Sequence, residues 1–395
     1  MNTIDKNLSF KAKEIRKSIL EVACKSKTAH VGSVLSCVDI LTSLYFHELK
    51  IDKNDWAKGI EKSRENYRLF GPVKDKNGVF IKDLKDDLLP DMTVDGSVMS
   101  VKSVLFPQTE KILSTTLDES KDGHHIMERI PFDSTLRAVI GIKPYDAKAV
   151  ELVRMNFDTE DYREPYWCDA YDATTFIGVG VNKPGPYDFS TATGTGPFAE
   201  EGLDVLMADM DGYYLAKVLT DKGEAYLKAC GFDAEADEKE SGSLFDVLKK
   251  EAEKAINASI QTDKLKDKTI LDLHEAPFWD DIAFSCINCG TCTFVCPTCW
   301  CFDIQDETKR GNVTRFRNWD TCMSGLFTKH ATGHNPRDSK TQRVRQRFMH
   351  KLKYFLDKYD KGIMCVGCGR CVKSCPVNID IREVCNIMNS YEKTS

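Results

Sequence analysis

Residues 286–297 read CINCGTCTFVCP, and residues 365–376 read CVGCGRCVKSCP. Both stretches have the spacing C-x2-C-x2-C-x3-C-P, which is typical of the ligand run for a [4Fe–4S] cluster. Where a protein carries two such runs, the fourth cysteine of each run binds the other cluster. The spacing therefore predicts two [4Fe–4S] clusters, and the predicted ligands are Cys286, Cys289, Cys292 and Cys375 for the first cluster and Cys365, Cys368, Cys371 and Cys296 for the second.

Zinc and disulfides are the other common uses of closely spaced cysteines. Structural zinc sites combine separated C-x2-C pairs or mix cysteine with histidine, whereas here three cysteines follow one another ahead of Cys-Pro. Disulfides persist in oxidising compartments, and residues 1–17 contain no apolar core of signal-peptide length. The pattern therefore favours iron–sulfur clusters, and we expect a cytoplasmic protein.

The composition is that of a folded protein with more than one domain. The chain has 395 residues, of which 42% are hydrophobic and 29% charged, so disorder is not expected. The net charge of −6 is mild, which argues against nucleic acid as a partner. No stretch approaches the roughly 18 apolar residues that a membrane span needs, so we expect no membrane partner.

The N-terminal segment resembles a different kind of protein. Residues 11–46 read KAKEIRKSILEVACKSKTAHVGSVLSCVDILTSLYF, and residues 8–56 as a whole resemble the N-terminus of transketolases. The resemblance places His30 where that family lines its thiamine diphosphate site. The GDG-type motif for diphosphate and magnesium is missing, and a motif counts only in its expected context. We therefore expect residues 1–56 to form a helical appendage; the alternative is a thiamine diphosphate-dependent, transketolase-like protein.

Residues 57–230 alternate short apolar runs with helical segments and turns. Residues 138–142 (AVIGI) end at Lys-Pro, and residues 175–181 (TFIGVGV) end at Asn-Lys-Pro-Gly. Short apolar runs that are stopped by such turn residues favour the strands of a mixed sheet. We therefore predict a mixed α/β domain, with further strands at residues 205–207 and 213–218.

Several segments of residues 60–395 resemble a family of iron–sulfur subunits. The family includes the iron–sulfur subunit of anaerobic sulfite reductase and the beta subunit of cytoplasmic nickel–iron hydrogenases (sulfhydrogenases). The resemblance implies an electron-transfer subunit that connects a flavoprotein subunit, which handles NAD(P)H, with a catalytic subunit. The matching segments are RLFGPVK (68–74), KSVLFPQTEK (102–111), AVIGIKPYDAKAVELV (138–153), GTGPF (194–198) and DVLMADMDGYYLAKV (204–218).

The middle domain departs from that family at its cysteines. The family commonly has a cysteine after the Lys-Pro pair and several more before Gly-Thr-Gly-Pro, whereas this chain has Tyr145 and residues 185–189 (GPYDF) there. Cys168 and Cys230 are the only cysteines of this domain. We therefore expect the middle domain to bind no metal and to act as a docking module.

The remaining chain is predicted to form a linker and a cluster domain. Residues 231–276 begin with an acidic stretch and continue with helical spacing, so we expect a linker and a connecting helix that packs against the cluster domain. In residues 277–395 the long spacer between the two cysteine runs suits the α-helical ferredoxin type, with a helix at residues 343–357. The predicted fold class is thus α+β with several domains.

Three more cysteines, Cys299, Cys301 and Cys322, follow the first run. They form a possible third metal site, because their segments also match the family; the alternative is buried thiols without a metal. The ligand needed to complete such a site would come from Cys385, His330 or His334.

The spacer is rich in basic residues that could stabilise the reduced, negatively charged clusters or attract an acidic partner. They are Arg315, Arg317, Arg337, Arg343, Arg345, Arg347, Lys351 and Lys353.

These observations predict an electron-transfer subunit of an anaerobic oxidoreductase complex that performs no substrate chemistry of its own. The chain shows no Rossmann fingerprint, so no NAD or FAD is expected on it, and no thiamine diphosphate either. The alternatives are the thiamine diphosphate enzyme and a structural or sensing iron–sulfur protein.

Overall fold

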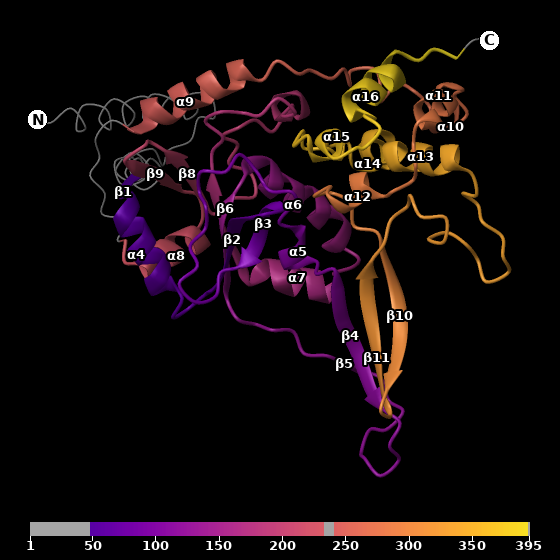
Figure 1. Cartoon of the computed structure of the whole chain (residues 1–395), viewed down its shortest axis with the longest axis horizontal. Coiled ribbons are helices and arrows are strands. Elements are labelled where there is room, and N and C mark those ends of the chain that lie inside the picture. Colours follow the sequence, from indigo (N-terminus) through magenta and orange to yellow (C-terminus); the bar gives the residue numbers. More distant parts are fainter. Residues whose placement is uncertain (1–47, 233–240, 394–395) are drawn as a thin grey trace, which may run out of the picture.

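The computed structural model describes residues 48–232 and 241–393. A sheet domain occupies the left of Figure 1, a helical cluster domain the right, and a narrow arm of strands projects from between them. The predicted helix at the N-terminus and His30 lie outside the described residues. No helix in the described ranges is both long enough and apolar enough to cross a bilayer.

The sheet domain is built on seven strands in the order β1-β9-β8-β7-β6-β2-β3. The four strands from β8 to β2 run parallel, and the strands at both edges are antiparallel. Every residue of β6 and β7 is buried, as expected for parallel strands that are covered on both faces. The mixed α/β prediction is confirmed. The strands are β1 (Glu48–Asp52), β2 (Arg68–Asp75), β3 (Gly78–Asp83), β6 (Arg137–Ile142), β7 (Thr174–Val179), β8 (Val205–Asp209) and β9 (Tyr213–Val218).

Helices cover both faces of this sheet. Helices α4 (Lys53–Ser63) and α8 (Asp221–Cys230) bury Trp56, Ile60 and Tyr226 against one face. The other face carries α5 (Lys102–Leu105), α6 (Pro144–Phe157) and α7 (Pro165–Asp172). Strand β1 pairs with β9 and is therefore part of this sheet. The predicted domain boundary after residue 56 falls within α4, which follows β1 directly.

A second sheet forms the arm and joins distant parts of the chain. Its strand order is β10-β11-β4-β5, with β4 (Thr109–Thr116) and β5 (Glu128–Arg129) from the sheet domain and β10 (Phe302–Lys309) and β11 (Asn312–Trp319) from the spacer. Arg310 and Gly311 both have positive φ, which suits a two-residue hairpin turn. The spacer therefore contains a hairpin that sequence analysis missed, besides its helices.

The cluster domain is helical, as predicted. Residues 340–359 form one continuous rod of α13 (Lys340–Met349), a π-helical turn η2 (His350–Tyr354) and α14 (Phe355–Tyr359), which confirms the predicted helix at residues 343–357. Ser339 and Gln342 form a capping box at its start. Trp279, Phe348 and Leu352 lie in its core. The other helices are α10 (Ile270–His274), α11 (Phe278–Phe284), α12 (Thr291–Phe294), α15 (Arg370–Lys373) and α16 (Ile381–Ser390).

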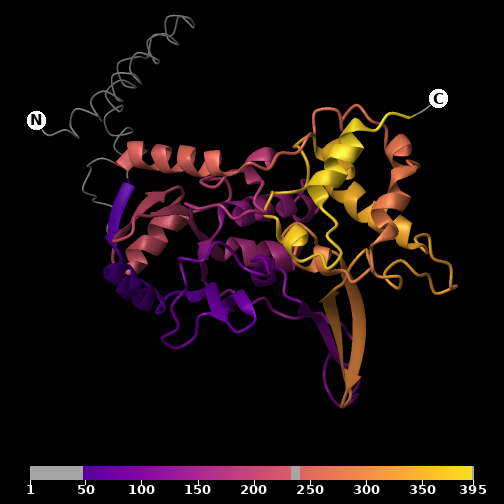
Figure 2. The same ribbon diagram turned by 45° about the horizontal axis from the view of Figure 1, so that its top comes forward.

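The connecting helix α9 (Ser241–Ala255) lies along the top of the sheet domain in Figure 2. Phe245 and Ala252 are buried in the core of that domain, and the Phe245 ring meets Phe198 edge-on at 6.2 Å between centroids. The prediction that this helix packs against the cluster domain is therefore wrong, because its apolar side packs against the sheet domain instead.

Candidate metal centre

The two cysteine runs fold into similar loops. Each loop turns at residues with positive φ, Asn288 and Gly290 in the first run and Gly367 and Gly369 in the second. A short helix, α12 or α15, follows and carries the third cysteine of its run. These turns let backbone N–H groups approach the sulfur atoms; Asn288 N donates to the Cys286 thiol at 3.4 Å.

The first thiol group consists of Cys286, Cys289, Cys292 and Cys375, which line one small cavity at the surface together with Cys371 of the second run. Burial, followed by charge repulsion from the other three thiols, raises the pKa of Cys286. Cys289 is exposed, and hydrogen bonding from Thr291 lowers its pKa. This group therefore lies at the edge of the protein.

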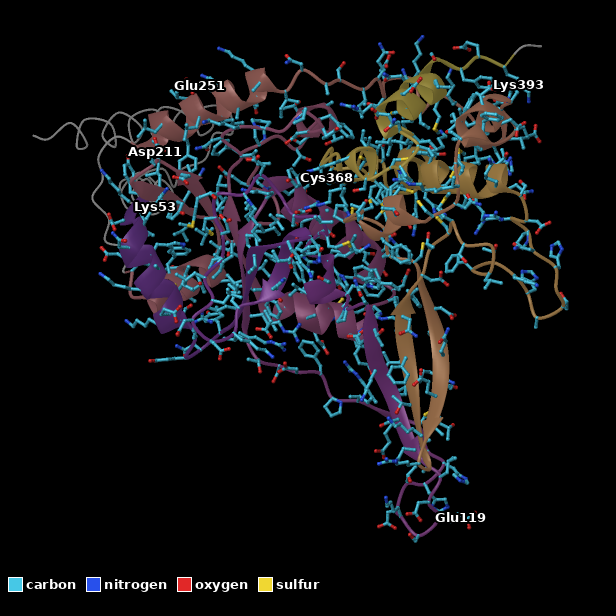
Figure 3. All side chains as sticks on the ribbon, in the orientation of Figure 1. Lys53, Glu119, Asp211, Glu251, Cys368 and Lys393 are labelled. Atoms are coloured by element: carbon cyan, nitrogen blue, oxygen red, sulfur yellow. The ribbon has the colours of Figure 1, made fainter. Side chains whose placement is uncertain are left out.

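The second thiol group consists of Cys365, Cys368, Cys371 and Cys296, all of which are half-buried, whereas Cys289 of the first group is exposed. Burial raises the pKa of Cys365 to about 12 and that of Cys368 to about 11, and Cys296 is a charged neighbour of both. Cys368, labelled in Figure 3, lies where α15 approaches the sheet domain. Because a metal binds the thiolate, loading of this group must release protons.

The structure thus places the fourth cysteine of each run beside the first three of the other run. Cys375 is a neighbour of Cys286, and Cys296 is a neighbour of Cys371. The predicted crossed ligand sets require these two cysteines to lie near the other run. The assignment of each thiol to a cluster stays a prediction.

Two buried cations lie among these thiols. Arg347 is 2% exposed and Lys351 is 3% exposed. The thiols that attract the Arg347 guanidinium come from both groups and include Cys292 and Cys371. Its Nη2 donates to the Cys292 carbonyl oxygen at 3.3 Å, while its Nε and Nη1 have no partner. Neither cation has a carboxylate partner among the described residues, so both lack the anion that a buried charge needs.

Other basic residues of the spacer form ion pairs with carboxylates. Arg317 pairs with Glu110 and Glu164 at the base of the arm, and Lys353 pairs with Asp357 at 2.8 Å. Arg315 pairs with exposed Asp306 on the arm. All of these basic residues lie in the same stretch of sequence. Only the structure shows which of them have carboxylate partners and which, like Arg347 and Lys351, do not.

The second cysteine loop is fixed to the sheet domain by a buried ion pair that sequence analysis missed. Arg370 donates through both Nη atoms to Asp146 at 2.6 Å, and through Nε to the Ser97 carbonyl oxygen at 2.8 Å. A Cβ on Gly369 would lie 2.2 Å from the Tyr187 carbonyl oxygen, so the two backbones are in close contact. The sheet domain therefore shapes the environment of the second thiol group.

The positions where the family carries further cysteines take part in the same contact. The Tyr145 hydroxyl donates to the Asp95 carbonyl oxygen at 3.1 Å, and its ring lies 5.5 Å from the Arg370 guanidinium. The backbone N–H of Phe189 donates to the Gly367 carbonyl oxygen at 2.9 Å. These residues support the second cysteine loop by packing and hydrogen bonding.

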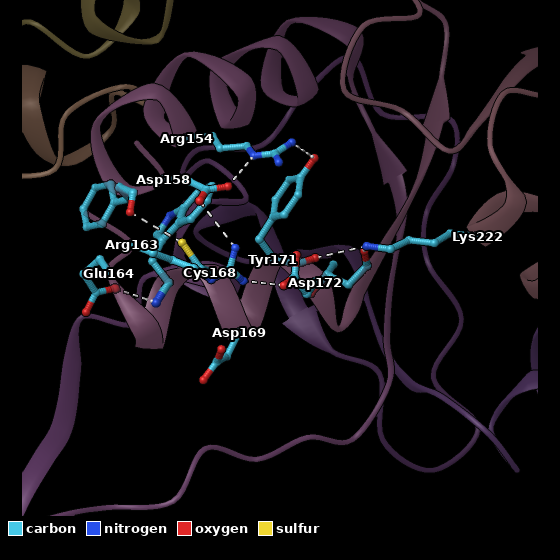
Figure 4. A network of polar contacts seen from close by, with 12 residues as sticks. Arg154, Asp158, Arg163, Glu164, Cys168, Asp169, Tyr171, Asp172 and Lys222 are labelled. Atoms are coloured by element: carbon cyan, nitrogen blue, oxygen red, sulfur yellow. Dashed lines mark hydrogen bonds and ion pairs between the residues drawn. The ribbon is translucent and has the colours of Figure 1, made fainter. Parts of the chain in front are cut away.

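Cys168 is a buried thiol that lies apart from all of these groups. Its thiol donates to the Phe157 carbonyl oxygen at 3.5 Å, and burial raises its pKa to about 11. Figure 4 shows it within a polar network in which Arg163 bridges Asp158 and Asp172. Cys168 therefore offers a matched control for substitutions of the other cysteines.

The third set of cysteines, Cys299, Cys301 and Cys322, lines a separate cavity of about 480 Å³. The residues suggested to complete this site do not line it. Cys385 is buried in α16 and hydrogen-bonded to Gln261, and the rings of His330 and His334 meet edge-on in an exposed loop. His350 lines the cavity instead, and sequence analysis did not single it out.

Lys143 gives the sheet domain a pH dependence that can be measured. It is 5% exposed at the end of β6, and burial lowers its pKa from 10.5 to about 8. Between these two values the unfolded chain binds more protons, so stability should rise with pH. The unfolding free energy of wild type relative to Lys143→Met is expected to increase by about 3 kcal/mol from pH 8 to pH 10.5. Denaturant unfolding at several pH values would show a constant difference if this is wrong.

Comparison with known proteins concerns the cluster domain first. Residues 285–379 match the family model described as a 4Fe-4S dicluster domain, so this part of the chain is similar to iron–sulfur dicluster domains. The chain is also 31% identical over 219 residues to the sulfhydrogenase 2 subunit beta of Pyrococcus furiosus. These findings confirm the resemblance to the iron–sulfur subunit family that includes sulfhydrogenase beta subunits.

The match to that relative is partial. It covers 55% of this chain and 64% of the relative, so the chain spans less than two thirds of the relative's length. No solved structure matches the chain. The resemblance of residues 8–56 to transketolases is not addressed by these matches and stays a prediction.

Proposed function

We propose that this chain is an electron-transfer subunit of an anaerobic oxidoreductase complex. In this proposal its two [4Fe–4S] clusters relay electrons between a subunit that binds flavin and NAD(P)H and a catalytic subunit of the hydrogenase or of the sulfite- or sulfur-reductase type. Support comes from the dicluster domain and from the named subunit that the chain resembles. A [4Fe–4S] cluster supplies one-electron chemistry, and the substrate chemistry belongs to the partners.

The observation that carries the proposal is the unpaired guanidinium of Arg347. A buried charge without a partner is costly, yet Arg347 has two nitrogen atoms without any hydrogen-bond partner in the interior. The thiols around it come from both groups. A cluster bound by four thiolates is an anion, so clusters at both groups would provide the missing counter-charge. A zinc ion at either group would supply no electron chemistry.

The two thiol groups also differ in depth, which gives the relay a direction in space. The first group opens to the surface at Cys289, where Phe284 and Ile287 are 84% and 63% exposed. The second group is half-buried, and Arg370 fixes its loop to the sheet domain. We therefore propose that a redox partner docks at the first cluster and that electrons pass from there to the second.

Reversible reduction tests this proposal. Protein purified without oxygen should take up at least two electrons per chain from a reduced flavoprotein and give them back to an oxidant, with EPR signals of reduced [4Fe–4S] clusters. Iron release on reduction, or clusters that no flavoprotein reduces, would favour a structural or sensing role and contradict the relay.

The same spectra test the crossed ligand sets. Cys375→Ser and Cys286→Ser should each lose about four irons and leave the same residual EPR signal, because both residues are assigned to the first cluster. Cys365→Ser should leave the other signal, and Cys168→Ser should leave both. If the residual signal of Cys375→Ser matches that of Cys365→Ser, the crossed assignment is wrong.

A further inference from the structure

The cavity at the base of the arm belongs to neither thiol group. It lies between the hairpin β10–β11 and the rod α13–η2–α14, and its wall contains three thiols, Cys299, Cys301 and Cys322. We propose that these three cysteines bind a third iron–sulfur cluster in this cavity. Such a cluster is additional to the two-cluster relay, and its presence does not depend on that relay.

The hairpin brings the thiols together. Cys301 directly precedes β10 and Cys322 follows β11, and the pairing of Phe302 with Trp319 closes the hairpin beside them. The Asp320 N–H donates to the Cys301 carbonyl oxygen at 3.0 Å. The Cys301 and Cys322 thiols are hydrogen-bonded to each other, so residues that are far apart in the spacer meet at one point.

The charged side chains near the cavity are positive and would be stabilised by an anion. Lys351 donates to the Thr298 hydroxyl at 2.6 Å and is almost fully buried. On the other side of the thiols, Lys102 donates to the carbonyl oxygens of Cys296 and Cys299 at 3.0 Å. No Asp or Glu lines the cavity, and neither lysine has a carboxylate partner in the described part of the chain. The negative charge of a cluster held by three thiolates would balance the positive charges of Lys351, Lys102 and Arg347.

The shape of the site favours a cluster over a single ion. No three Cys, His, Asp or Glu side chains among the described residues converge closely enough to hold one ion. The thiols of the two predicted clusters do not converge either, as expected when each thiolate binds a different corner of a cube. Three thiolates here would hold three irons, as the first three cysteines of each run do, and the fourth iron would face the cavity, whose wall includes His350.

The irregular turn of the rod supports the same interpretation. The helix changes from α to π at His350, and His350, Lys351 and Tyr354 of that turn all line the cavity. Such π-turns cost helical regularity and are frequent at functional sites. The cavity also borders the second thiol group, because the Cys296 and Cys299 thiols are hydrogen-bonded. A cluster there would be within reach of the second cluster.

Counting iron and acid-labile sulfide tests the third site. Wild-type protein purified without oxygen should contain about twelve irons per chain, and Cys322→Ser and Cys301→Ser about eight. The variants should keep the EPR signals of the first and second clusters, which shows that they are folded, and should lose an additional signal. Cys168→Ser, which removes a buried thiol elsewhere, should keep all the iron.

About eight irons in wild type, unchanged in Cys301→Ser and Cys322→Ser, would overturn the third site and leave the relay standing. Zinc at the site without extra labile sulfide would overturn it as well. Conversely, about twelve irons in protein that no flavoprotein reduces would support the third site while contradicting the relay.

Discussion

Arg347→Met is expected to lower the reduction potentials of the first and second clusters by an amount on the order of 100 mV. Reduction adds one negative charge to a cluster, and the Arg347 guanidinium is buried among thiols of both groups. Removing its positive charge makes that added electron harder to accept. Because the side chain has no carboxylate partner in the described residues, its field is not cancelled locally.

Redox titration followed by EPR measures this effect directly. Arg347→Lys keeps the charge and should shift the potentials much less than Arg347→Met. Arg315→Met removes a cation that is already paired with Asp306 on the exposed arm, and should leave the potentials unchanged because solvent screens it. Equal potentials in wild type and Arg347→Met would show that Arg347 does not face clusters.

The cysteine runs could be predicted from sequence because their information is local. Each loop consists of a few residues whose spacing is fixed by the geometry of a cluster. Strands β6 to β9 of the sheet domain were also predictable, since runs such as β6 and β7 are short, apolar and bounded by turn residues, whereas β1, β2 and β3 were not predicted. The helix at residues 343–357 followed in the same way from its apolar spacing.

The features that sequence analysis missed depend on distant partners. The hairpin β10–β11 forms one sheet with β4, so its exposed strand β10 and its half-buried strand β11 gain stability from a segment far away in the chain. The basic residues of the spacer look alike in sequence, yet Arg317 is neutralised by Glu110 and Glu164 while Arg347 is not. His350 lies in the π-helical turn and lines the cavity, next to segments that are distant in the sequence.

Asp146→Ala is expected to be strongly destabilising, by about 3 to 5 kcal/mol, because it leaves the Arg370 guanidinium buried without its counter-charge. Asp146 and Arg370 are 3% and 7% exposed, and they join α6 to the loop that carries Cys368 and Cys371. The variant should therefore also lose iron from the second cluster sooner than from the first during unfolding.

Denaturant unfolding without oxygen, followed by iron release, measures both effects. The double variant Asp146→Leu/Arg370→Met should recover most of the lost stability, since an apolar pair of similar size replaces a buried ion pair at little cost. Asp306→Ala, which breaks the exposed pair with Arg315, should have little effect. If Asp146→Ala were no more harmful than Asp306→Ala, the sheet domain would not hold the second cysteine loop, and its role as a support for that cluster would have to be abandoned.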